Sequence, residues 1–88
     1  MVDDIILTDN GKKVLAFMQK NDVVWVGKDM IDKTGIKGIY PVLNSLIKRG
    51  LIENAEPVTR MFVNSKGEEK PKDYKTYYLT DFGRTYLI

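Results

Sequence analysis

The sequence predicts a small α+β domain whose elements follow the order helix, strand, helix, turn, helix, hairpin, helix. Apolar residues recur at helical spacing over 14–18 and 36–47. β-branched and aromatic residues cluster in the short segments 23–26, 58–63 and 74–79. The chain has 88 residues, enough for one hydrophobic core, so we expect 1–88 to form a single domain.

The composition argues against catalysis and metal chemistry. The sequence has no cysteine and no histidine, so disulfides, thiolate sites and the commonest general base are excluded. It offers no nucleophile with a base partner and no glycine-rich phosphate loop. We therefore expect a protein without catalytic residues, metal ligands or a cofactor.

The amino-terminal segment has neither the basic start nor the apolar run of a secretory signal. No segment approaches the roughly 20 apolar residues of a membrane span. We expect a soluble, cytoplasmic chain that has no membrane partner.

The first helix is predicted from Thr8, which can cap free backbone amides, to about Lys20, where a turn-forming Asn-Asp pair follows. Its apolar stripe consists of Val14, Leu15, Phe17 and Met18. The segment 23–26 then has the composition of a short strand, which needs partners from elsewhere in the chain.

Two further helices are predicted at 28–33 and 37–49, separated by a tight turn at Gly35. Pro41 falls in the first turn of the second helix, where a missing N–H breaks no intrahelical bond. Gly50 is expected to terminate that helix in a left-handed conformation. The buried stripe of the second helix comprises Ile36, Ile39, Leu43, Leu46 and Ile47.

A β-hairpin is predicted over about 57–79, with strands at 58–63 and 74–79. The ten polar residues between them, 64–73, are expected to form a long solvated tip. Thr80 and Asp81 then begin a last short helix.

One short motif occurs twice. The run from Leu7 to Lys12 matches the run from Leu79 to Arg84 at four identities and one Lys/Arg pair. Since nothing between the copies repeats, we interpret both as capped helix starts with a tightly packed first turn.

The positive charge is concentrated in the middle of the chain. The net charge is only +2, but residues 28–50 contain five basic and two acidic side chains. A basic helical segment in an otherwise balanced chain is typical of a surface that binds an anionic partner such as nucleic acid.

The order of elements resembles the winged-helix family, in particular small MarR-like regulators. The resemblance is carried by the 28–49 segment ending in LNSLIKRGLIE, by the charged hairpin, and by the strand-to-helix step in YYLTDFGRTYL. Gly38 and Pro41 occupy early positions of the second helix where many relatives have Ser, Thr or Arg. The resemblance implies a helix-turn-helix core, a two-stranded wing and a transcriptional regulator that binds specific duplex DNA sequences.

The exposed face of the helix 37–49 is the predicted reading surface. Tyr40, Asn44 and Lys48 are spaced four residues apart and lie on one outward line, with Ser45 beside them. Asn and Lys can contact base edges in the major groove, and Tyr can donate to phosphate. Lys37 lies near the amino end, where the helix dipole attracts phosphate.

The hairpin adds the candidate phosphate or minor-groove contacts Arg60, Lys66, Lys70 and Lys72. Three acidic residues in the same segment, Glu68, Glu69 and Asp73, cancel much of this charge, so a simply solvated hairpin is an equal alternative.

Two other functions stay open. The domain could be a protein-interaction module or an accessory subunit, which the balanced charge of the hairpin favours. Trp25 and the tyrosines could stack on single-stranded bases, although we expect most of them to pack in the fold. A homodimer is also expected to suit DNA reading, because one helix reads only a few base pairs.

Overall fold

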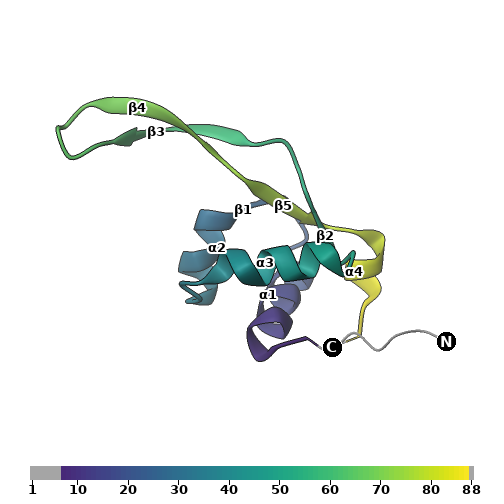
Figure 1. The fold of residues 1–88 in the computed structure, drawn as a ribbon. Coiled ribbons are helices and arrows are strands. Elements are labelled where there is room, and N and C mark those ends of the chain that lie inside the picture. Colours follow the sequence, from purple (N-terminus) through teal and green to yellow (C-terminus); the bar gives the residue numbers. More distant parts are fainter. Residues whose placement is uncertain (1–6, 88) are drawn as a thin grey trace.

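The α+β prediction is confirmed by the computed structural model, which describes residues 7–87. Within these residues, a short strand lies between the first two of three helices, and further strands and a short last helix follow the third (Figure 1). The elements are α1 (Asp9–Lys20), β1 (Trp25–Val26), α2 (Gly27–Thr34), α3 (Ile39–Lys48), β2 (Ile52–Asn54), β3 (Val58–Val63), β4 (Glu69–Tyr74), β5 (Thr76–Leu79) and α4 (Asp81–Thr85).

The core lies between the first three helices and a small antiparallel sheet. Its centre is made of side chains with at most 1% exposure, drawn from every predicted apolar stripe. Leu51 and Ile52, which follow α3, are also fully buried. The central members are Val14, Leu15, Met18, Met30, Ile39, Leu43, Leu46, Tyr77 and Leu79.

The helix α3 begins two residues later than predicted. Its N-cap is Gly38, which has ψ 52° and no side chain to hold the free amides. Lys37 therefore lies in the connection between α2 and α3, and Pro41 occupies the first turn as expected.

The end of α3 agrees with the prediction. Gly50 has φ +75°, its N–H donates to the carbonyl of Ile47, and the N–H of Leu51 donates to that of Leu46. This pair of bonds is a Schellman motif, which directs the chain back toward the core. As a result, Leu51 is buried in the core and Ile52 begins β2 directly after it.

The core sheet has the order β1-β5-β2, and the sequence did not predict β2. In the register, Trp25 lies opposite Tyr77, and Ile52 lies opposite Leu79. The predicted strand 23–26 is shorter than expected, because Val23 and Val24 are exposed and only Trp25 and Val26 pair.

The prediction for the hairpin is wrong at its second strand. β3 pairs with β4 over six residue pairs from Val58↔Tyr74 to Val63↔Glu69, whereas β5 belongs to the core sheet. The residues 69–73 are thus strand and not loop. Each strand of a two-stranded ribbon has one free edge, so β4 can be mostly polar and can accommodate Pro71.

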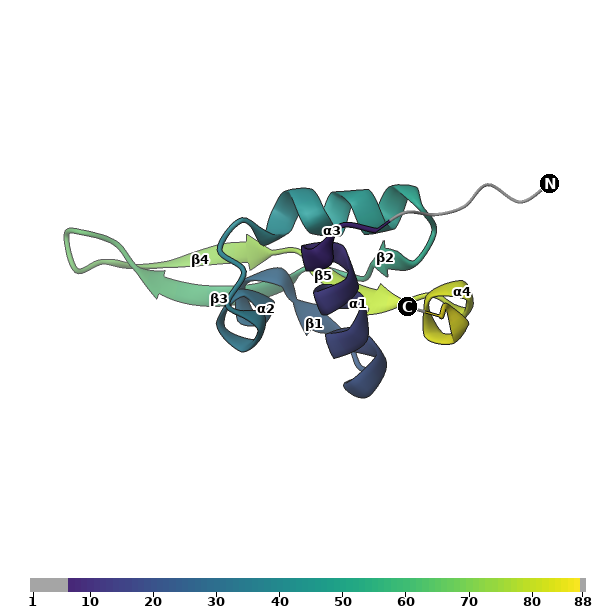
Figure 2. The ribbon, with the colours of Figure 1, turned by 90° about the horizontal axis from the view of Figure 1, so that it is seen from below.

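The tip is correspondingly short. The N–H of Asn64 donates to Glu68, and the N–H of Gly67, at φ +80°, donates back to Asn64. These bonds close a three-residue loop, a usual hairpin length when a glycine takes the left-handed position. The hairpin extends well away from the helices (Figure 2), and the longest dimension of the described residues is 55 Å.

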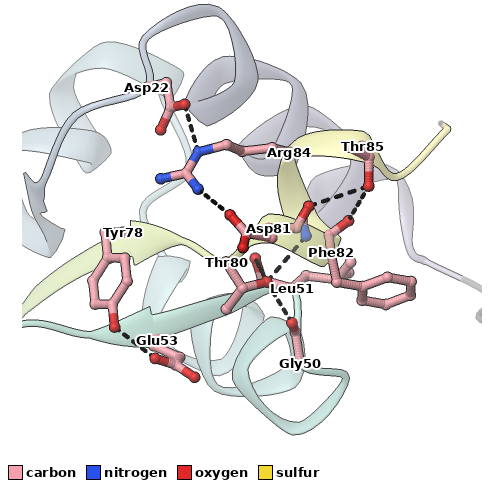
Figure 3. A network of polar contacts seen from close by, with 11 residues as sticks. Asp22, Gly50, Leu51, Glu53, Tyr78, Thr80, Asp81, Phe82, Arg84 and Thr85 are labelled. Carbon is pink, nitrogen blue, oxygen red and sulfur yellow. Dashed lines mark hydrogen bonds and ion pairs between the residues drawn. The ribbon is translucent and has the colours of Figure 1, made fainter.

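The two copies of the repeated motif are both capped helix starts, as predicted. The hydroxyl of Thr8 accepts from the N–H of Gly11, and that of Thr80 accepts from Gly83, each at 3.0 Å. Thr80 also donates to the carbonyl of Gly50, which joins α4 to the end of α3 (Figure 3).

Helix α4 is further fixed to the end of α1. Arg84 donates to Asp22 and Asp81, both at 2.7 Å (Figure 3). The Gln19 amide donates to the carbonyls of Gly83 and Tyr86. This end of the molecule, remote from the hairpin, is therefore fixed by several polar contacts.

Candidate nucleic-acid interface

The outward face of α3 has the predicted composition. Tyr40, Asn44 and Lys48 are all exposed, while Ile39, Leu43 and Leu46 on the opposite side are buried. The spacing prediction is confirmed to this extent. One turn of helix separates each of the three side chains from the next, so a groove-sized partner could reach all of them.

Two predicted members of this face are placed differently. Ser45 is half-buried, and its hydroxyl accepts a 2.6 Å hydrogen bond from Arg49, so it is less available than predicted. Lys37 is exposed but belongs to the turn before α3, not to the helix.

Tyr40 links α3 to the amino end of α2. The ring atom Cε1 of Tyr40 lies 3.0 Å from the position that a Cβ on Gly27 would occupy, and so does Cε1 of Tyr77. The absence of a side chain at Gly27 therefore leaves room for the Tyr40 ring at the start of α2, beside the buried Tyr77. Although 41% exposed, Tyr40 is thereby positioned by contacts on its inner side.

Arg60 connects the hairpin to the amino end of α2 through an ion pair. Its two terminal nitrogens donate to the two carboxylate oxygens of Asp29, each at 2.9 Å. The Arg60 hydrogen bonds, helped by Lys28 and Lys33, hold the pKa of the Asp29 carboxyl below its ordinary value, against a smaller opposing effect of burial. Arg60 thus has an intramolecular partner that sequence reasoning did not anticipate.

Basic side chains also gather around one aromatic ring. The Nζ atoms of Lys28 and Lys72 each lie 5.4 Å from the centre of the Tyr74 ring, and the Arg60 guanidinium lies 6.0 Å from it. These distances are within cation–π range. Lys28 and Tyr74 were not among the predicted site residues. The signal for Lys28 was present in the basic excess of 28–50, but its pairing with Tyr74 depends on a contact 46 positions away.

The register separates the charges of the hairpin onto opposite faces. Side chains alternate along a strand, so cross-strand pairs two residues apart share a face. We call one side the basic face; it has no acidic residue and consists of Val58, Arg60, Phe62, Lys70, Lys72 and Tyr74. We call the other the acidic face; it has no basic residue and consists of Thr59, Met61, Val63, Glu69, Pro71 and Asp73.

Side-chain contacts agree with this assignment. Lys72 lies over Phe62 and Tyr74, and Arg60 reaches Asp29, so the basic face is the one turned toward α2. On the other side, Thr59 donates to Asp73 at 2.6 Å. Lys70 and Lys72 thus share their face with no acidic residue of the two strands, whereas Arg60 is paired with Asp29 of α2. Lys66 is exposed in the tip loop, between the two faces.

Most other aromatic residues pack, as predicted. Trp25 stacks at a tilt on Phe17, with centroids 4.8 Å apart, and donates to the carbonyl of Asn21. Tyr77 is buried in the core, and burial raises the pKa of its phenol. Tyr78 donates to Glu53, and this hydrogen bond raises the pKa of Tyr78 (Figure 3).

The described residues present this surface without an enclosed site. Within 7–87, no pocket is found, and no three carboxylates come close enough together to hold a metal ion. No helix in this part of the chain has the length and apolarity that a membrane span requires.

The fold and the surface together define a small α+β protein in which residues 27–29 of α2 contact both the exposed face of α3 and the basic face of the hairpin. No protein-family model matches the chain, and no curated protein matches it.

Proposed function

We propose that this chain is a winged-helix protein that binds duplex DNA, with α3 as the recognition helix and the β3–β4 hairpin as the wing. The observation that supports this most directly is the junction at residues 27–29. There Tyr40 of α3 contacts Gly27, Lys28 approaches Tyr74, and Asp29 holds Arg60. The reading helix and the basic face of the hairpin are thereby connected through one short segment.

In this proposal α3 lies in the major groove. Asn44 makes a paired contact to an adenine edge, and Lys48 contacts guanine or a phosphate. Lys37, in the turn before α3, and Tyr40 bind backbone phosphates and fix the register of the helix. The role of Ser45 is reduced, because Arg49 already occupies its hydroxyl.

The basic face of the hairpin binds the adjacent DNA backbone. Lys70 and Lys72 are exposed and have no acidic neighbour on their face. Lys28 extends the same charge onto α2. Arg60 acts chiefly by positioning the hairpin, since Asp29 occupies its guanidinium, and Lys66 reaches the backbone from the tip. The biological role that suits such a surface is transcriptional regulation.

The test is binding of labelled duplex DNA measured by fluorescence anisotropy across a salt series. Asn44→Ala and Lys48→Ala should each weaken binding, and Lys48→Ala should lower the slope of log K against log salt by about 1. Lys13→Ala is the matched control, because Lys13 is an exposed lysine of α1 outside the surface. The proposal fails if no duplex binds at low salt, or if the control variant weakens binding as much as Lys48→Ala.

Sequence specificity requires a second measurement. Selection from a random duplex pool should yield a short preferred site, and Asn44→Ala should relax the preference at one position, at a cost of about 1–3 kcal/mol. Sedimentation of the DNA complex then distinguishes one bound copy from the two-fold pair expected for a longer site.

A further inference from the structure

The acidic face of the hairpin has exposed apolar side chains that the DNA proposal does not use. Met61 and Val63 are 60% and 62% exposed, although both side chains are apolar. Pro71 lies directly opposite Met61, so the three form a continuous apolar strip. On the basic face, by contrast, the apolar residues Val58, Phe62 and Tyr74 are half-buried.

Carboxylates border this strip at both ends. Glu69 lies opposite Val63 near the tip, and Asp73 lies opposite Thr59 near the base. Asp73 accepts a hydrogen bond from Thr59, so its carboxylate is held at the surface of the face. No lysine or arginine shares the face. The combination is an apolar centre between two negative charges.

We propose that the acidic face is a docking site for another protein, which binds through an extended basic segment whose apolar side chains lie between Lys or Arg residues. Apolar side chains of the segment cover Met61 and Val63, and its cations pair with Glu69 and Asp73. The complementary charge fixes the register and excludes wrong partners.

The charge of the face selects among possible occupants. Nucleic acid and anionic membrane surfaces are repelled by Glu69 and Asp73. A second copy of the same face would place like charges together. The face has six residues, whereas each side of a stable dimer interface contributes roughly 20–30. It therefore suits a peptide-like segment bound weakly.

The docking site goes beyond the proposed DNA function and does not depend on it. Because the two faces of a ribbon point in opposite directions, a partner on the acidic face leaves Lys70 and Lys72 free for DNA. The hairpin would then connect a DNA site to a protein partner across the thickness of one β-ribbon.

The test is a titration of the isotope-labelled protein, followed by NMR, with the peptide Lys-Ile-Lys-Val-Lys-Ile-Lys, capped at both ends. The matched probe replaces each Lys by Glu. We expect saturable shifts, at millimolar peptide, in the methyl signals of Met61 and Val63 and the amides of Glu69 and Asp73. The acidic probe should cause none.

Variants separate the contributions of charge and apolar contact. The double variant Glu69→Lys with Asp73→Lys should weaken peptide binding at least tenfold. The control with the same change in net charge, Asp32→Lys with Glu56→Lys, alters exposed acidic residues elsewhere and should have little effect. Since the first variant also removes the Thr59 hydrogen bond, Met61→Ser with Val63→Ser provides a test that leaves every charge in place.

Three results would overturn the proposal. These are the absence of saturable shifts at millimolar peptide, shifts that instead lie on α3 or the basic face, and equal binding by the Glu69/Asp73 variant and its control. Concentration-dependent shifts of Met61 and Val63 without peptide would assign the face to a second copy and also contradict it. None of these outcomes bears on DNA binding, which the anisotropy series measures separately.

Discussion

The glycines of the repeated motif have the same local role but very different surroundings. Both Gly11 and Gly83 donate their N–H to a capping threonine. A Cβ on Gly83 would collide with the backbone carbonyl oxygen of Leu51, which cannot move without displacing β2. A Cβ on Gly11 would meet the hydroxyl oxygen of Thr8 at 3.3 Å and nothing closer.

We therefore expect Gly83→Ala to destabilise the fold by about 1–3 kcal/mol or more, as overpacking does. Gly11→Ala should change the free energy of unfolding by less than about 1 kcal/mol, because the helix propensity of Ala offsets the tight contact. Urea unfolding followed by circular dichroism measures both. Equal effects of the two substitutions would mean that α4 does not pack on Leu51 as described.

Among the elements, the hairpin is the one held by few contacts to the helices. Its side-chain contacts with α2 include the Arg60–Asp29 ion pair and the cation–π contact between Lys28 and Tyr74. Asp29→Asn removes the charge that aligns the Arg60 fork. We expect faster amide exchange along β3 and β4 in this variant, with little change in overall stability, because exposed ion pairs contribute little.

The same pair predicts a pH dependence of hairpin order. The folded-state pKa of Asp29 is lowered by Arg60, so ionised Asp29 stabilises the docked hairpin above its unfolded pKa of about 3.9. This contribution is lost as the pH falls below that value through the lower folded pKa. Hairpin exchange in the wild type should then approach that of Asp29→Asn, when compared as a ratio at each pH. A constant ratio between the two proteins from pH 7 to pH 3 would contradict the assignment.

At the level of elements, the sequence predicts what is encoded locally. Three predicted features depend only on neighbouring residues: helix α1, the two threonine caps and the end of α3 at Gly50. All three are confirmed. β2 was missed because three residues give no periodicity, and its pairing partner is about 25 positions away. Residues 69–73 of β4 were predicted as loop, because Pro71 is their only apolar residue and they show no apolar alternation.

In the candidate site, too, the features that depend on neighbouring residues are predictable from the sequence, and those that depend on distant contacts are not. The outward positions of Tyr40, Asn44 and Lys48 follow from helical spacing, so the sequence is sufficient to place them. The Arg60–Asp29 bridge and the two hairpin faces depend on register and docking. A one-residue shift in register would have moved Lys70 and Lys72 to the other face from Arg60.

For the molecule as a whole, we expect DNA affinity to depend more on which face of the hairpin carries a charged side chain than on the net charge. The net charge is +2. If DNA affinity depended on net charge alone, Lys72→Glu and Glu69→Lys would have equal and opposite effects, because each changes the net charge by the same amount. With the two faces separated, Lys72→Glu should weaken binding more than tenfold, while Glu69→Lys should change it much less. Anisotropy at fixed ionic strength compares them. Effects of equal size and opposite sign would show that only overall charge attracts DNA.

The short link between the hairpin and the core has a mechanical consequence. β4 continues into β5 through Lys75 alone, and the carbonyl of Lys75 accepts the N–H of Gly27. β5 is the middle strand of the core sheet (Figure 1). It contains Tyr77, whose ring lies near Gly27, as does the ring of Tyr40. Residue 75 is thus the point at which the hairpin strand β4 joins the central strand of the core sheet. A partner that displaces the hairpin would therefore act on β5, whose Tyr77 ring lies beside Gly27 together with the Tyr40 ring of α3.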